Sequence, residues 1–334
     1  MGKRCRSLRI QGERMKFTKY QLFTYEGESG SRAGLTLGTE WFDLGDVARA
    51  TDRTRLADVT LDDLLARWES VAAELNALAS EIAANPTGFA AEALDTASLT
   101  LRAPFIRPGA IYAAGANYRD HVEAMGRAFN QKLVLDPKKE GVPPWHFLKS
   151  GAATLSGHRA EVPYPPRTER LDWEAELAVV IGKRASKVSA QSALEHVAGY
   201  MCANDLSARD YLVRAGVDPS SPFRFDWIGH KCFNGSCPLG PVFTPAQFVD
   251  SPENLGIKLW LNGQLRQDSN TRNHLYGVAD QIAYLSERVD LLPGDVILTG
   301  TPAGVGMETG TFLKRGDVMK VWIEGLGELE TRIV

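Results

Sequence analysis

Two glutamates begin a stretch that is otherwise apolar, at a spacing that brings their carboxylates together. Residues 171–182 read LDWEAELAVVIG, and this short apolar run closed by a glycine predicts a buried strand. Because side chains alternate across a strand, Glu174 and Glu176 share one face. Neighbouring carboxylates repel each other, so a cation between them stabilises the pair. The pattern indicates a site for Mg²⁺ or Mn²⁺, with a solvated edge of an antiparallel strand as the alternative.

A second segment supplies a third carboxylate. Residues 199–210 read GYMCANDLSARD and again pass from apolar to polar. Asp205 follows the strand-like part, where it is either a metal ligand or the N-cap of the turn or helix that begins there. Three carboxylates plus water suit a Mg²⁺ site that keeps positions open for a substrate. Ca²⁺ is a further candidate for the same oxygen ligands in crystals.

Five segments, taken in order, resemble the fumarylacetoacetate hydrolase family over roughly residues 105–334. They read DWEAELAVVIG (172–182), GYMCANDLSARD (199–210), KCFNGSCPLGP (231–241), LLPGDVILTGTPAGVG (291–306) and GDVMKVWIEGLG (316–327). Each motif is weak by itself, but five in register make chance a poor explanation. The resemblance implies an α+β, mostly β fold. Its C-terminal catalytic domain would be a mixed β-roll or sandwich, with a small N-terminal α+β domain, in a protein that pairs as a homodimer.

Composition restricts the classes of partner. The 334 residues are 44% hydrophobic and 24% charged with a net charge of −3, which argues against binding to nucleic acid or an anionic membrane. The sequence contains no run of 18 or more apolar residues, so it predicts no membrane span. The four cysteines, Cys5, Cys202, Cys232 and Cys237, lack zinc-site spacing, and their settings fit reduced thiols in a cytoplasm.

Local patterns divide the chain into three parts. Residues 1–14 are basic and precede Met15, so we expect a disordered extension; 15–105 form the small N-terminal domain and 106–334 the catalytic domain. Strands are expected at 20–25 and 32–37, a hairpin turn at Asn262-Gly263, and helices at 60–85, 118–125, 189–198 and 275–289. Thr60 predicts the N-cap of the first helix, with Asp63 completing a capping box.

Residues 115–121, GANYRDH, place a histidine after a turn into a helix. The resemblance implies that this segment is a mobile lid, that His121 is the general base on water, and that Tyr118 binds substrate. Relatives carry a glutamate three positions after the histidine, where this chain has Ala124. Glu123 is two positions away and would point elsewhere on a helix. The partner of His121 is therefore open, and a helix-surface histidine is the alternative.

Other positions match the family one by one. The resemblance assigns Lys231 a place beside the metal, Lys149 and Arg209 to substrate binding, and Thr301 to the substrate oxyanion. Gln267 is a secondary substrate-binding candidate at the mouth of the site. Leu212 departs from the pattern because relatives often carry glutamine there, which suggests a different substrate group.

The leading hypothesis is a Mg²⁺/Mn²⁺-dependent hydrolase that cleaves a carbon–carbon bond of a small β-diketo or 2-oxo acid, such as an acylpyruvate or a fumarylacetoacetate-like compound. The same enolate chemistry without an activated water gives a decarboxylase or an isomerase of 2-oxo or 2-hydroxymuconate-type diacids. A non-catalytic protein that binds a small molecule is a third hypothesis. It is favoured by the departures at Leu212 and Ala124 and by Asn234-Gly235, which stand where relatives carry aspartate and threonine. The intact set of three carboxylates argues against it.

Overall fold

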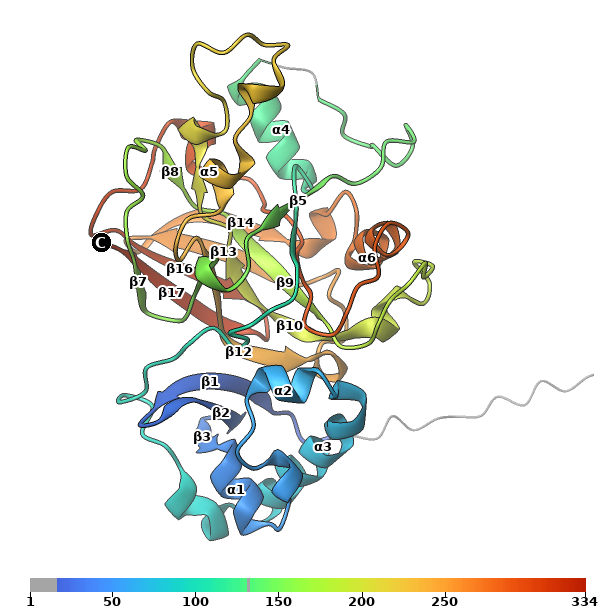
Figure 1. Ribbon diagram of the computed structural model, residues 1–334, viewed down its shortest axis with the longest axis vertical. Coiled ribbons are helices and arrows are strands. Elements are labelled where there is room, and N and C mark those ends of the chain that lie inside the picture. Colours follow the sequence, from blue (N-terminus) through green and yellow to red (C-terminus); the bar gives the residue numbers. More distant parts are fainter. Residues whose placement is uncertain (1–16, 131–132) are drawn as a thin grey trace, which may run out of the picture.

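A computed structural model describes residues 17–130 and 133–334 and shows a predominantly β protein with peripheral helices (Figure 1). The expected disordered extension, residues 1–14, lies outside the described residues. The α+β, mostly β fold class predicted from the sequence is confirmed.

Three sheets contain the strands of the described chain. The largest has the order β3-β2-β1-β12-β10-β9-β15-β4-β5, with β6 paired to β12. Its strands are β1 (Gln21–Gly27), β2 (Gly30–Leu37), β3 (Glu40–Asp43), β4 (Ile111–Ala114), β5 (His146–Lys149), β6 (Leu155–Ser156), β9 (Ala175–Ile181), β10 (Val197–Asn204), β12 (Cys237–Pro245) and β15 (Val296–Leu298). The second has the order β14 (Gln264–Asn270), β13 (Gly256–Leu261), β16 (Val318–Ile323), β17 (Gly327–Ile333) and β7 (Ala160–Val162). A small third sheet pairs β8 (Leu171–Asp172) with β11 (Ser207–Ala208).

The helices are short apart from α3. They are α1 (Leu44–Ala50), α2 (Leu61–Leu65), α3 (Trp68–Ala84), α4 (Arg119–Ala128), α5 (Trp227–Lys231), α6 (Val278–Ser286) and α7 (Gly306–Thr309). Single 3₁₀ segments are Thr54–Leu56, Pro86–Glu92, Ala152–Thr154, Ala193–His196, Arg209–Tyr211, Pro222–Arg224, Ala246–Phe248 and Thr271–Asn273.

Strand β9 lies inside the large sheet and is buried along its whole length, which explains its nearly continuous apolar sequence. Ala178 and Val180 pack into one core, together with helices α2 and α3 and strand β1. Leu177 and Val179 pack into a second core with β13 and β16. The first strands of the chain extend the same sheet, because β1 pairs with β12. The domain boundary near residue 105 stays a prediction.

Several local predictions are confirmed. Thr60 and Asp63 form the capping box of α2, and Asn262 with Gly263 connects β13 to β14, both with positive φ as a type I′ turn requires. The helix predicted at 60–85 is interrupted between α2 and α3. The helix at 275–289 is shorter than predicted.

The helix predicted at 189–198 is wrong. Residues Ala193–His196 form one 3₁₀ turn, and Val197 already pairs with Ile181 of β9. The apolar residues of this stretch pack in the core of the sheet, so pairing with a neighbouring strand overrides the helix-compatible spacing.

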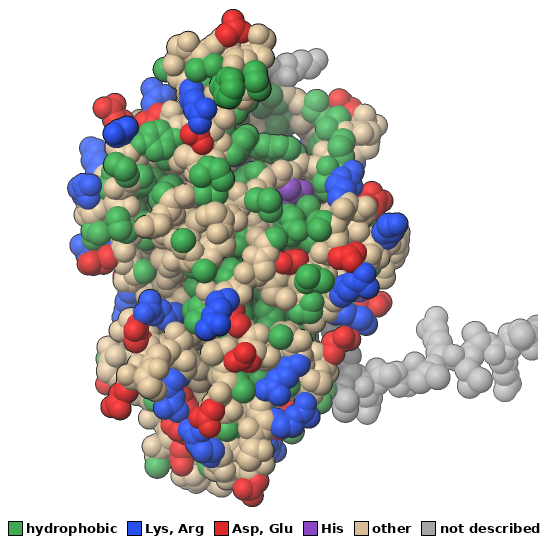
Figure 2. Space-filling model, in the orientation of Figure 1, with side chains coloured by type: hydrophobic (Ala, Val, Ile, Leu, Met, Phe, Trp, Pro, Cys, Tyr) green, Lys and Arg blue, Asp and Glu red, His purple; other side chains and the backbone are tan. Residues whose placement is uncertain are grey.

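The surface carries both signs of charge. On the face drawn in Figure 2, lysine and arginine side chains alternate with aspartate and glutamate rather than forming one broad basic field. Within the described residues, no helix combines the length and hydropathy that crossing a membrane requires.

Candidate metal and catalytic site

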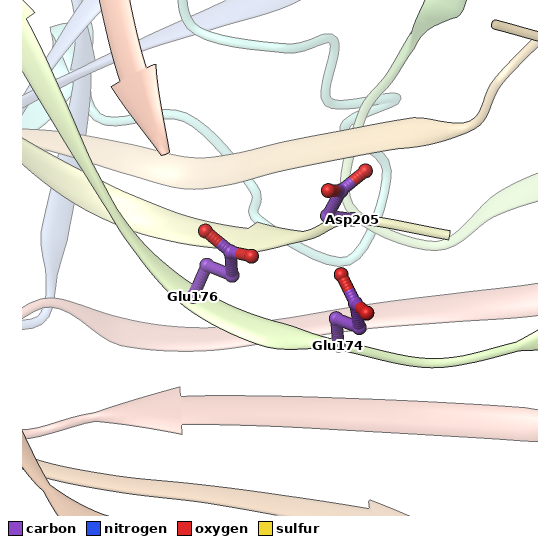
Figure 3. A group of neighbouring side chains, drawn as sticks. All are labelled: Glu174, Glu176 and Asp205. Atoms are coloured by element: carbon purple, nitrogen blue, oxygen red, sulfur yellow. The ribbon is translucent and has the colours of Figure 1, made fainter. Parts of the chain in front are cut away.

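Three carboxylates meet where β9 and β10 lie side by side. Glu174 directly precedes β9, Glu176 lies within it, and Asp205 directly follows β10. The Asp205 N–H donates to the Glu174 carbonyl at 2.9 Å, which keeps the two strands in register at this end. One oxygen of each side chain lies within 4.8 Å of the others, and all three residues are buried (Figure 3). The same-face prediction for the two glutamates and the inclusion of Asp205 agree with this geometry.

Two lysines bind the carboxylates. Lys231, the last residue of α5, donates from Nζ to Glu174 Oε2 and Asp205 Oδ2, both at 2.7 Å. Lys149, the last residue of β5, donates to Asp205 Oδ1 and to the Lys231 carbonyl, both at 2.6 Å. Burial opposes a charged amine, but the charges of Asp205 and Glu174 outweigh it and raise the pKa of Lys231. Lys231 is therefore a fixed cation of the site.

Arg209 joins the same network from the 3₁₀ turn after β11. Its guanidinium donates to Asp172 Oδ2 at 2.9 Å and to Glu174 Oε1 at 2.5 Å. Although burial alone would raise the pKa of Glu174, the charges of Arg209 and Lys231 hold it below its usual range. Glu174 is consequently ionised.

Glu176 is the carboxylate that this network leaves uncompensated. At this site, the three cations Lys149, Lys231 and Arg209 form ion pairs with Asp172, Glu174 and Asp205. Among the described residues, none of these ion pairs includes Glu176. The Gly300 N–H donates to its Oε2 at 2.6 Å. Burial, followed by the charges of Asp205 and Glu174, raises the pKa of Glu176 well above its usual range. A divalent cation between the three side chains would supply the missing charge, so the donor set fits a hard metal ion.

His121 has a partner that the sequence did not reveal. Its Nδ1 lies 2.7 Å from Oε1 of Glu308, which belongs to α7, and the other carboxylate oxygen accepts the Gly304 N–H at 2.7 Å. Both residues are buried apart from about a tenth of each side chain. An ionised carboxylate can only accept, so in the neutral imidazole the proton lies on Nδ1 and Nε2 is left as an acceptor.

Thr301 is oriented by Gln267. The Gln267 amide nitrogen donates to Thr301 Oγ1 at 2.9 Å and to the Pro302 carbonyl at 2.7 Å, while its oxygen accepts the Ala175 N–H at 3.0 Å. With one lone pair of the hydroxyl occupied, its proton is free to point at a ligand oxygen.

A cavity of about 210 Å³ lies over the carboxylates. Its described lining includes six of the ten site residues predicted from the sequence: His121, Glu174, Glu176, Arg209, Lys231 and Thr301. The other four, Tyr118, Lys149, Asp205 and Gln267, are buried residues outside this described lining. Lys149, Asp205 and Gln267 contact the site through the hydrogen bonds above, whereas Tyr118 packs edge-on against His274.

Sequence reasoning also missed Asp172. This fully buried carboxylate accepts the N–H groups of Gly306 at 2.6 Å and Met307 at 3.1 Å in addition to Arg209. It thereby joins Arg209 to the start of α7, which carries Glu308. Its place in the DWEAE motif, two residues before Glu174, was the signal in the sequence that could have identified it.

Comparisons with known proteins place this geometry in a family. The model of the fumarylacetoacetate hydrolase C-terminal domain matches residues 110–334. A relative from Homo sapiens, a mitochondrial oxaloacetate tautomerase, is 39% identical over 243 residues, which cover 72% of this chain and 71% of the relative.

Two solved structures are similar as well. Fumarylpyruvate hydrolase from Pseudomonas aeruginosa, in complex with Mn²⁺ and pyruvate, is 34% identical, with a TM-score of 0.58 over 68% of this chain and 90% of that one. Maleylpyruvate hydrolase from Sphingobium, in complex with the same two ligands, is 28% identical, with a TM-score of 0.65 over 94% and 98%. This chain therefore belongs to the fumarylacetoacetate hydrolase family.

Proposed function

We propose that this protein is a divalent-metal-dependent hydrolase that cleaves the carbon–carbon bond of an acylpyruvate-type acid. The observation that carries this proposal is the place of His121, which is paired with Glu308 and lines the same cavity as Glu174 and Glu176. A hydrolase needs a base that activates water as well as a metal site, and both are present in one 210 Å³ space.

Glu174, Glu176 and Asp205 would hold the metal. A divalent ion held there would supply positive charge that stabilises the negative charge developing on the 2-oxo acid end of the substrate. Mg²⁺ and Mn²⁺ fit these oxygen ligands. The related hydrolases whose structures contain Mn²⁺ and pyruvate support this choice of metal and of substrate end.

The chain's own residues would carry the proton transfers. Glu308 holds the Nδ1 proton of His121, so Nε2 can take a proton from water. The resulting hydroxide attacks the acyl carbonyl, and the bond between that carbon and its neighbour breaks. The electron pair passes to the pyruvate fragment, which takes up a proton, while the acyl part leaves as a carboxylic acid. Thr301 lines the cavity, and its hydroxyl would donate to a substrate oxygen. Arg209 lines the cavity too, where it holds Asp172 and Glu174 in place.

A tautomerase or isomerase is the second candidate. The relative named oxaloacetate tautomerase, at 39% identity, favours it. Such a reaction uses the same charge stabilisation beside a 2-oxo group but moves a proton between carbon and oxygen, and no water attacks. His121 could serve that proton transfer too, so the site geometry is compatible with both reactions.

One experiment separates these reactions. The purified protein is incubated with acylpyruvates or with the enol form of oxaloacetate, in Mg²⁺ or Mn²⁺ and in EDTA, and products are followed by ultraviolet absorbance and chromatography. Release of pyruvate and a carboxylic acid that stops in EDTA is expected. Enol–keto conversion without cleavage of any acylpyruvate would overturn the hydrolase proposal in favour of the tautomerase. A homodimer and a cytoplasmic location stay predictions.

A further inference from the structure

The cavity over the carboxylates is lined by two kinds of side chain. Besides the polar groups described above, six apolar side chains line it and are called the apolar wall below: Met125, Trp145, Phe147, Leu212, Trp227 and Met307. Phe147 connects the two kinds, because the Lys231 Nζ lies 4.9 Å from its ring centroid. A substrate that places its 2-oxo acid end at the carboxylates can therefore extend the rest of its chain along this apolar wall.

Three aromatic rings give this wall a defined shape. The Trp227 ring lies 5.4 Å from Phe147 in a stacked arrangement and 5.1 Å from Trp145 in an edge-on one, measured between centroids. Gly115 makes room for Trp145, because a Cβ on Gly115 would lie 1.5 Å from Trp145 Cζ3. The Gly115 N–H also donates to the Trp145 carbonyl at 3.0 Å. The wall is therefore held together by aromatic packing and offers an apolar surface to a ligand.

The described lining offers no free cation to a second carboxylate. Arg209 and Lys231 already bond to Asp172, Glu174 and Asp205. His230 is neutral, since burial and then the charges of Lys231 and Arg209 lower its pKa to about 3, and its Nδ1 lies 3.0 Å from the Ala208 carbonyl oxygen. A carboxylate packed against the apolar wall would lose hydration without gaining an ionic partner from these groups.

We propose that the substrate's tail, the group beyond the reacting carbonyl, is an alkyl or aryl group and not a terminal carboxylate. This inference rests on the proposed function and specifies its substrate class: apolar acylpyruvates in preference to diacids of the fumarylpyruvate kind. Leu212 is a specificity residue in this scheme, because it occupies the lining beside Arg209 without offering a polar atom.

Binding of two matched acids tests the proposal without relying on turnover. 2-Oxohexanoate and 2-oxohexanedioate have the same number of carbons and differ in a terminal methyl versus a terminal carboxylate. Neither has a 4-oxo group, so neither undergoes the hydrolysis. Isothermal titration calorimetry with Mg²⁺ should show 2-oxohexanoate binding roughly tenfold tighter or more. Equal or tighter binding of the dioate would overturn the inference and leave the proposed function standing.

A substitution that places a positive charge in the wall tests the same inference a second time. Leu212→Arg should raise the affinity for 2-oxohexanedioate and so reduce or reverse the preference for 2-oxohexanoate. The control Leu212→Met should still bind 2-oxohexanoate more tightly than the dioate. An unchanged ratio in Leu212→Arg would show that the tail does not reach this wall and would overturn the inference. Failure of both acids to bind wild-type protein would instead contradict the 2-oxo acid site on which the proposed function depends.

Discussion

Glu308 lies 2.7 Å from Nδ1 of His121, although 187 positions separate the two residues in the chain. The helix α4 carries the histidine and the short helix α7 carries the glutamate. The Gly304 N–H holds the second carboxylate oxygen, so Glu308 is fixed on both sides. A carboxylate held in this way orients the imidazole and stabilises the imidazolium that forms when Nε2 accepts a proton.

Glu308→Gln should lower kcat for acylpyruvate hydrolysis by about 10- to 100-fold, because the amide cannot stabilise a protonated His121. Steady-state kinetics at saturating Mg²⁺ measures the loss. Glu123→Gln is the matched control: this residue lies on α4 close to His121 in sequence, but it is not among the described residues of the cavity lining. A large loss in Glu123→Gln with normal Glu308→Gln kinetics would contradict the pairing seen in the structure.

His121→Ala should lower the hydrolytic kcat by roughly 10²–10⁴-fold and leave metal binding intact, since the histidine is not part of the carboxylate cluster. Decarboxylation of a 2-oxo acid needs no activated water, so that activity should fall less. Calorimetry with Mn²⁺ and parallel assays of the two reactions give the comparison. Equal and small losses in both would remove His121 from the role of base.

The carboxylate cluster was predictable because its geometry follows from local rules. Glu174 and Glu176 share a face by the two-residue period of a strand, and Asp205 ends the neighbouring strand-like segment. The partner of His121 was not predictable in the same way. Helical spacing excludes Glu123, but nothing local indicates that Glu308, 187 positions along the chain, lies against His121 of α4. Long-range contacts of this kind depend on the path of the whole sheet.

In the fold as well, local features were predictable from the sequence and long-range pairing was not. Short-range signals such as the Thr60 capping box and the Asn262-Gly263 turn are reproduced in the structure. The prediction of a helix at 189–198 was wrong because Val197 and the residues after it form β10, which pairs with β9. The sequence of one segment does not show which strand will pair with it.

Glu176→Gln should stabilise the metal-free protein at pH 7. The folded state raises the pKa of Glu176 well above its ordinary value of 4.5, so ionisation of this residue favours the unfolded state as pH rises above 4.5. Glutamine removes that cost. The gain should therefore shrink toward zero as the pH falls below 4.5, which urea unfolding in EDTA at several pH values measures.

The same variant should respond weakly to metal. Mn²⁺ at 100 times its dissociation constant would stabilise the wild type by about 2.7 kcal/mol, provided that it binds only the folded state. Glu176→Gln lacks one anionic ligand, so its unfolding should shift much less at the same Mn²⁺ concentration. Equal stabilisation of both proteins by Mn²⁺ would place the metal somewhere other than between Glu174, Glu176 and Asp205.

Asp172→Asn should cost about 1–3 kcal/mol of unfolding free energy, because an amide cannot accept from Arg209, Gly306 and Met307 at once and leaves a buried donor unpaired. Asp290→Asn is the comparison, since its ion pair with Arg184 is exposed and such pairs contribute roughly 0–1 kcal/mol.

Steady-state kinetics of Asp172→Asn should distinguish a role in packing from a role in positioning the site. Asp172 joins Arg209 to the start of α7, so Asp172→Asn should raise KM and lower kcat even at temperatures where circular dichroism shows the variant fully folded. Kinetics indistinguishable from wild type under those conditions would reduce Asp172 to a structural residue.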